Sequence, residues 1–181
     1  MKKHQLCLTV IGASGLLLYG VAATAQQTGS SANRLTSADS TFATKAAQGG
    51  LAEVKLGQLA QEKASNQAVK DFGQKMIDDH TKANDDLKSV ASQEGITLPT
   101  SLDAKDQATY DRLSKLSGAD FDKAYMHDMV MDHRADVSEF RRQSQQGGNP
   151  ALKSFAARTL PVLQQHLTLA VQTEGKVRTE K

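Results

Sequence analysis

The pattern of apolar and polar positions is clearest between Phe121 and Phe140, FDKAYMHDMVMDHRADVSEF. At helical spacing the apolar residues of this stretch fall on one stripe, which is the face that an amphipathic helix turns toward a core. His133 lies in the middle of the stripe, where the pattern requires an apolar residue. The stretch therefore predicts a buried helix with one ligand-type side chain near its midpoint.

Two earlier segments have the same form. The segment from Asp39, an N-cap residue type, to about Ser65 predicts a first helix, and Glu53 lies on its stripe of small and apolar residues. The next segment predicts a second helix that ends with Gly95 as its C-cap. His80 lies on the apolar stripe of this helix.

Three further segments complete the predicted elements. Residues 102–116 form a shorter amphipathic stretch and predict a connecting helix over one end of the core. The helix that contains His133 is expected over residues 119–146. Asn149 followed by Pro150 predicts the start of the last helix, which runs to about residue 174 and carries His166 on its buried face.

Four long helices with short connections imply antiparallel neighbours in a bundle. At 1.5 Å per residue, the four polar residues of the stripes lie within about one turn, roughly 5 Å, of a common height. The sequence therefore predicts an all-α fold, an up-down four-helix bundle with a short extra helix between the second and third long helices. It also predicts that one interior layer contains Glu53, His80, His133 and His166.

Three imidazoles and one carboxylate in an apolar core need partners, since burying such groups unpaired costs several kcal/mol. They either hold a metal ion, for which Zn, Cu, Fe and Mn are candidates, or hydrogen-bond to one another as a structural polar network. Both interpretations stay open at this stage. The methionines of the stripe are interpreted as core residues, Met131 points away from it, and His127 is expected at the surface.

The N-terminus has the pattern of an export signal. Lys2 and Lys3 precede a short apolar run that ends in the small-x-small motif of Ala23 to Ala25. Residues 1–25 are therefore expected to be a signal peptide, residues 26–38 a flexible leader, residues 39–174 the bundle and residues 175–181 a polar tail. The expected location is the periplasm, with association with the outer membrane left open.

Charge narrows the classes of partner. Removal of Lys2 and Lys3 lowers the number of Lys and Arg residues from 22 to 20, which equals the 20 Asp and Glu residues. This balance argues against nucleic acid as a partner, and the chain has no Trp that could stack on bases. No transmembrane segment is expected in the mature chain. A metal ion, an envelope protein or a second copy of the chain remain as partners.

Three motifs, each around a histidine, resemble one known family. KMIDDHTKANDDL (75–87), FDKAYMHDMVMDH (121–133) and LPVLQQHLTLA (160–170) resemble the bacterial exported domain of unknown function 4142. Its members are often labelled outer membrane proteins and placed among ferritin-like four-helix bundles. The resemblance implies that fold for this chain, but it implies no particular activity.

The chain departs from the di-iron pattern of ferritin-like proteins, which requires Glu-x-x-His on two helices. The residues three positions before the histidines are Ile77, Val130 and Leu163. A mononuclear or histidine-rich site fits better, with Asp79 and Asp132 as candidates for contacts behind the ligands.

These observations predict an exported helical bundle that binds a metal ion for storage, sequestration or redox and stress protection. The alternative is a non-catalytic envelope or partner-binding bundle whose buried polar layer is purely structural. No nucleophile motif of a hydrolase occurs in the chain, so catalysis is left open, with a non-enzyme favoured.

Overall fold

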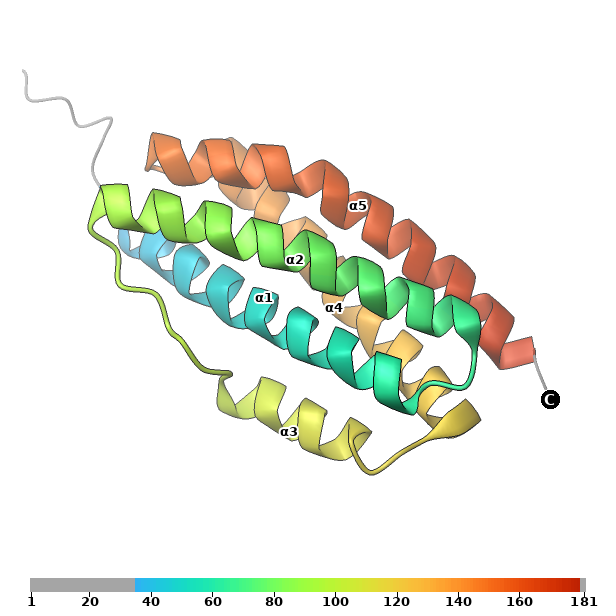
Figure 1. Ribbon diagram of the computed structural model, residues 1–181. Coiled ribbons are helices and arrows are strands. Elements are labelled where there is room, and N and C mark those ends of the chain that lie inside the picture. Colours follow the sequence, from blue (N-terminus) through green and yellow to red (C-terminus); the bar gives the residue numbers. More distant parts are fainter. Residues whose placement is uncertain (1–34, 180–181) are drawn as a thin grey trace, which may run out of the picture.

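The computed structural model describes residues 35–179, and the predicted signal peptide and most of the predicted leader lie outside this range. The described residues contain no strand, and their five helices are α1 (Ser37–Lys63), α2 (Gln67–Glu94), α3 (Ala104–Leu113), α4 (Gly118–Gln146) and α5 (Pro150–Thr179). The four long helices lie side by side, and the short α3 lies outside them, next to α1 (Figure 1). The predicted all-α fold with a short extra helix is confirmed.

Short turns of three residues join α1 to α2 and α4 to α5. The longer connection, residues 95–117, contains α3 and leads from α2 to α4. Beyond these sequential neighbours, α2 contacts α5 and α1 contacts α4. Each long helix therefore faces two others, and the four enclose a common interior.

The start of α1 differs from the prediction by one turn. Thr36, not Asp39, is the N-cap, and the two residues form a capping box. Thr36 Oγ1 accepts from the backbone N–H of Asp39 at 3.1 Å, while the Asp39 carboxylate accepts from the backbone N–H of Thr36 at 3.0 Å. Asp39 thus serves the helix end from its third position, where an acidic residue is also favourable. Gly95 has the predicted left-handed C-cap conformation, with φ at 67°.

The end of α5 also differs from the prediction. A polar tail was expected from residue 175, but α5 continues to Thr179. Val177 is 3% exposed and belongs to the apolar core at this end of the bundle. One buried valine anchors a turn whose other side chains face solvent.

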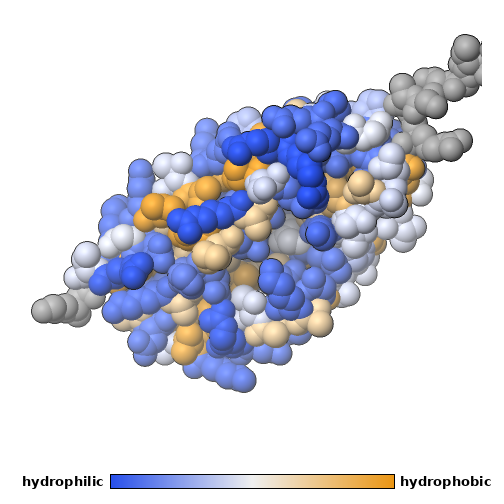
Figure 2. All heavy atoms as spheres, turned by 180° about the vertical axis from the view of Figure 1, so that it is seen from behind, coloured by the Kyte–Doolittle hydropathy of each residue, from blue (hydrophilic) through white to orange (hydrophobic). Residues whose placement is uncertain are grey.

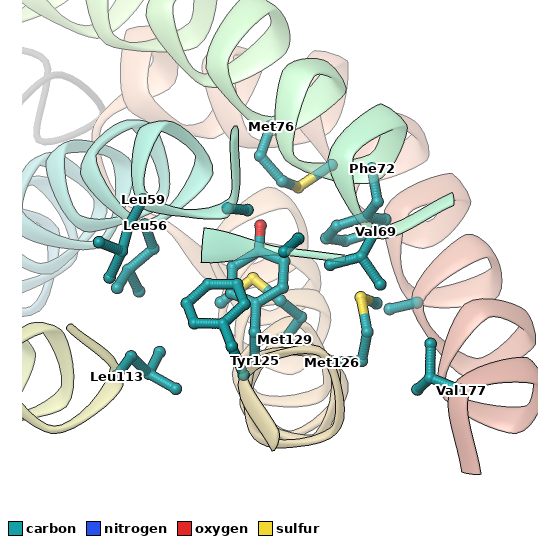
Figure 3. Close-up of a cluster of buried hydrophobic side chains, with 14 of the residues drawn as sticks. Leu56, Leu59, Val69, Phe72, Met76, Leu113, Tyr125, Met126, Met129 and Val177 are labelled. Atoms are coloured by element: carbon teal, nitrogen blue, oxygen red, sulfur yellow. The ribbon is translucent and has the colours of Figure 1, made fainter. Parts of the chain in front are cut away.

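The interior contains two apolar clusters, one toward each end of the long helices. The first surrounds Tyr125 and draws residues from all five helices (Figure 3). The second is built on the aromatic rings of Phe42, Phe140 and Phe155, with the first two in edge-to-face contact at 5.0 Å. The histidines of the predicted layer lie between the two clusters along the chain, as His80 does on α2.

Glycines allow α1 and α2 to approach closely. A Cβ atom at Gly57 would lie 2.6 Å from the carbonyl oxygen of Gly73, and one at Gly50 would lie 2.0 Å from Oδ1 of Asn84. Both distances are too short for a real contact. Gly57 has no room for a side chain against the backbone of α2, whereas a side chain at Gly50 would require that of Asn84 to move. Its neighbour Gly49 does not take part in this approach, since a Cβ at Gly49 would meet nothing within 4 Å.

The face turned away from the viewer in Figure 1 is covered mainly by hydrophilic side chains, with apolar atoms in small patches between them (Figure 2). Across residues 35–179, none of the helices combines the length and the apolar character needed to cross a membrane.

Candidate metal centre

Three buried histidines from three helices converge in the middle of the bundle. His80 comes from α2, His133 from α4 and His166 from α5, and their exposed fractions are 6%, 0% and 0%. The ring centroid of His166 lies 5.4 Å from the ring centroids of both other histidines, and the ring centroids of His80 and His133 are 5.8 Å apart. One nitrogen of each ring lies within 4.8 Å of the other two. The structure thus brings the three histidines of the predicted layer together.

A backbone carbonyl fixes the tautomer of His133. Its Nδ1 lies 2.9 Å from the carbonyl oxygen of Met129, one turn earlier on α4. A carbonyl can only accept, so Nδ1 carries the hydrogen and donates it. In the neutral ring Nε2 is then a bare lone pair.

A carboxylate fixes the tautomer of His166 in the same way. Nε2 of His166 lies 2.7 Å from Oδ2 of Asp79, which also pairs with Nζ of Lys75 at 2.9 Å. Burial acts to raise the pKa of Asp79, but the hydrogen bond with His166 and the Lys75 ammonium outweigh it and hold the pKa below its usual value. The ionised carboxylate accepts, so Nε2 donates and Nδ1 of His166 is left as a bare lone pair.

One nitrogen of each ring has no hydrogen-bond partner among the described residues. These nitrogens are Nε2 of His80, Nε2 of His133 and Nδ1 of His166, and all three are buried. Two lone pairs cannot hydrogen-bond to each other, and His80 could donate to only one of them. A purely structural network therefore leaves at least one buried acceptor unpaired, which costs about 1–3 kcal/mol.

The three histidines do not carry a second proton at neutral pH. Burial lowers the pKa of each of the three histidines, and the neighbouring imidazoles lower those of His80 and His133 further. The pKa of His133 falls to about 4. The three rings are therefore neutral near pH 7, the state in which imidazole binds a metal ion.

The donor set fits a transition-metal ion in both chemistry and spacing. Imidazole suits Zn, Cu and Fe, and a tetrahedral ion with metal–nitrogen bonds of about 2.0–2.1 Å holds its donors roughly 3.3 Å apart. The three nitrogens already lie within 4.8 Å of one another. Binding of an ion requires these nitrogens to move closer together, and three protein ligands leave a coordination position open.

Glu53, the fourth predicted ligand, is buried with 1% exposure, but it lies beside His133 rather than among the three nitrogens. Its Oε1 is 3.7 Å from Nδ1 of His133, the nitrogen that faces the Met129 carbonyl. Neither carboxylate oxygen has a hydrogen-bond partner among the residues described. Burial, and then the charges of Asp132 and Asp136, raise the pKa of Glu53 well above its usual value. Its role as a ligand stays a prediction.

Tyr125 is a second buried group without a partner near Glu53. Its hydroxyl lies inside the first apolar cluster and has no hydrogen bond within the described part of the chain (Figure 3). Burial and the Glu53 carboxylate raise its pKa well above 10. The ring of Phe72 stands edge-on to both Tyr125 and His133, at 6.1 and 6.2 Å. The layer is thus continuous from Tyr125 to the imidazoles.

The contacts behind the ligands were predicted only in part. Asp79 does lie behind a histidine, but this histidine is His166 on α5 and not its chain neighbour. Asp132 instead faces Lys105 at 3.9 Å. The Met129 carbonyl and the Tyr125 hydroxyl had no signal in the sequence, because one is backbone and the other lies on an otherwise apolar stripe.

The residues expected to lie away from the site are confirmed at the surface. His127 is exposed, with its Nδ1 3.3 Å from Oε1 of Glu174. Met131 is 53% exposed. Neither can contribute to the buried layer.

The chain is similar to one solved structure, described as the crystal structure of a DUF305 fragment from Deinococcus radiodurans. The TM-score is 0.69 at 11% sequence identity, and the match covers 78% of this chain and 98% of that one. At this identity the likeness concerns the fold alone. A comparison with curated proteins finds no match. The sequence profile of the family described as Domain of unknown function (DUF4142) matches residues 24–173, which is most of the chain, and the protein therefore belongs to this family.

Proposed function

We propose that this protein is an exported, periplasmic metal-binding protein with a ferritin-like, up-down four-helix bundle. It holds one transition-metal ion through Nε2 of His80, Nε2 of His133 and Nδ1 of His166, for storage, sequestration or redox and stress protection.

The observation that carries this proposal is the orientation of the tautomers. The outer nitrogens of His133 and His166 are committed as donors to Met129 and Asp79. The inner nitrogens are therefore lone pairs that point toward a common space, and a cation is the partner that can satisfy all of them at once. The alternative, a structural polar layer, needs donors at that place, and the described residues supply at most one, from His80.

The surroundings favour a soft or borderline divalent ion. Three neutral nitrogens suit Zn, Cu and Fe better than Mn. Two carboxyl groups stand behind the rings, Asp79 on His166 and Glu53 near His133. Asp79 is ionised, and Glu53, which its raised pKa keeps neutral in the metal-free protein, loses its proton when a cation binds, so that both offset part of the charge of the ion. We place Glu53 in this outer position, and Glu53→Gln distinguishes it from a direct ligand: an outer group lowers metal affinity by about 10–100-fold, whereas loss of a ligand abolishes stoichiometric binding.

The decisive experiment is elemental analysis of untagged protein purified from the periplasm, together with two variants of α4. His133→Ala removes a central ligand, and His127→Ala removes an exposed histidine of the same helix. We expect about one metal ion per chain in the wild type and in His127→Ala, and none in His133→Ala. Mass spectrometry of the same sample tests export, since cleavage after Ala25 predicts a chain that starts at Gln26.

A wild-type protein that carries no metal, and binds none at micromolar Zn, Cu, Fe or Mn, would contradict the proposal. Metal that is lost equally in both variants would also contradict it, because a surface histidine would then matter as much as the buried one.

A further inference from the structure

An acidic crevice opens on the surface between α1, α3 and α4. It has a volume of about 330 Å³. Five acidic side chains line it against only Lys45 and Lys105, namely Asp103, Asp106, Asp132, Asp136 and Glu139. Burial and neighbouring acidic groups raise the pKa of Asp106, as expected where carboxylates crowd together. The crevice is therefore a place where a cation is attracted from solution.

A second, smaller cavity adjoins the crevice and is lined by one histidine of the candidate metal centre. It has a volume of about 20 Å³, enough for one water-sized occupant, and residues of all four long helices line it. His80 is one of them. Its Nε2 is buried and has no hydrogen-bond partner among the described residues, so the cavity is lined by a histidine that has an unsatisfied ring nitrogen.

The crevice and the cavity share one wall. Ala46 and Gly49 of α1 and Asp136 and Phe140 of α4 line both. Gly49 is the smallest member of this wall, and a Cβ atom built on it would meet nothing within 4 Å. Gly49 thus adds no side chain to the shared wall, and Asp136 lines both spaces.

We infer that a divalent transition-metal cation reaches the three histidines through this route, from the acidic crevice, past Gly49 and Asp136, into the cavity on which His80 opens. The inference rests on the proposed metal site and adds how the ion enters. The side of the bundle that α3 partly covers is the entrance, and His80 is the first ligand that the incoming ion meets.

The test is the rate of Co²⁺ uptake by the metal-free protein, followed in a stopped-flow instrument by the visible absorption of bound Co²⁺. Gly49→Leu places a bulky side chain at the shared wall, where the structure leaves room for it. We expect association to slow at least tenfold. Dissociation should slow by the same factor, so that the dissociation constant is unchanged, because a blocked route alters the path and not its end states.

Gly175→Leu is the matched control. A Cβ at Gly175 also meets nothing within 4 Å, and this residue lies near the end of α5, away from the route. Both rates should equal those of the wild type. The variant shows whether a helical Gly→Leu change affects uptake by itself.

A second variant tests the charge of the crevice and does not depend on Gly49. Asp106→Asn should lower the association rate about two- to fivefold at low ionic strength and leave it unchanged at high salt, where charges are screened. Asp85→Asn, an exposed carboxylate on α2 with 69% side-chain exposure, should have no effect at either salt concentration.

Association rates that are unchanged in both Gly49→Leu and Asp106→Asn, in a protein that still binds one Co²⁺, would overturn the route and leave the metal site standing. A wild-type protein that takes up no Co²⁺ at equilibrium would overturn the metal site itself, and the route with it.

Discussion

Asp39 and Glu53 are both carboxylates of α1 and both are buried, with exposed fractions of 0% and 1%, yet their surroundings are opposite. Asp39 accepts five hydrogen bonds, from the backbone N–H groups of Thr36, Gly148 and Asn149 and from the side chains of Thr36 and Gln143. Glu53 accepts none from the described residues. Burial acts to raise the pKa of both, but the donors around Asp39 outweigh it and lower its pKa, whereas the pKa of Glu53 rises.

The contrast shows that a buried polar group with a structural role in this fold is supplied with hydrogen-bond donors. Asp39 ties the start of α1 to the turn between α4 and α5. At the other end of the bundle Asp122 ties α4 to the turn between α1 and α2 through Ser65 and Asn66. Both ends are satisfied with backbone and side-chain donors. The middle layer, with Glu53 and three imidazole nitrogens that have no hydrogen-bond partner among the described residues, is not satisfied in this way, and structural need therefore does not explain it.

The largest expected effect is that of Asp39→Ala. The change leaves three donors without an acceptor, the buried Gln143 Nε2 and Asn149 N–H and the more exposed Gly148 N–H, and it also removes half of a capping box. We expect the free energy of unfolding in urea to fall by about 3–5 kcal/mol. Asp85→Ala, at an exposed site, should change it by less than about 0.5 kcal/mol. The metal content of the protein that remains folded should not change.

In contrast to Asp39→Ala, Glu53→Leu should increase the free energy of unfolding of the metal-free protein. Leucine has a similar volume and removes a buried carboxyl group whose oxygens accept no hydrogen bond from the described residues, at the loss of a weak contact with the Asp132 carboxyl group, so the unfolding free energy measured in EDTA should rise by about 1–2 kcal/mol. A loss as large as that of Asp39→Ala would break the comparison, because it would show that Glu53 has structural partners. The same variant should bind metal more weakly than the wild type, since it removes the carboxyl group beside His133 that can ionise when a cation binds.

The sequence contained enough to predict the elements and the three converging histidines. His80, His133 and His166 each interrupt an apolar stripe of period 3.6, and that period fixes which face of a helix is buried without knowledge of its neighbours. Turn residues such as Gly95 and Asn149 then limit the connections, so the heights of the histidines follow by counting.

The sequence could not supply contacts that depend on how the helices are rotated against each other. Asp79 is one residue from the stripe of α2, and only the packing of α2 on α5 turns it toward His166. Glu53 has the predicted height, but the placement of α1 beside α4 puts it near the outer nitrogen of His133. The crevice is likewise formed by α3, whose docking position leaves no periodic signal.

A smaller effect, expected from Asp136, extends the comparison to pH. Burial raises the pKa of Asp136 to about 8, and Asp132 acts in the same direction. The charged and titratable groups that face it or share its two pockets are Lys45, Glu53, His80, Lys105, Asp106, Asp132 and Glu139. Like Glu53, and unlike Asp39, it is a carboxyl group that the fold favours in its neutral form.

Between pH 4 and pH 8 the folded protein therefore holds a proton on Asp136 that the unfolded chain has released, so this residue lowers stability progressively as the pH rises through that range. Asp136→Asn removes the dependence. In EDTA, the unfolding free energy of the variant minus that of the wild type should be near its minimum at pH 4 and increase up to about pH 8. The increase should be on the order of 1 kcal/mol, since the partly exposed carboxylate is screened by solvent.

For Asp39→Asn the pH dependence has the opposite sign. The pKa of Asp39 is lowered in the fold, so this carboxylate stabilises the wild type above about pH 4, and the stabilisation is lost as the pH falls. The Asp39→Asn variant should therefore be most destabilised, relative to the wild type, at neutral pH. Parallel pH profiles for the two variants would show that the fold stabilises both carboxyl groups in the same charge state. The contrast between the hydrogen-bonded ends of the bundle and its unpaired middle layer would then not hold.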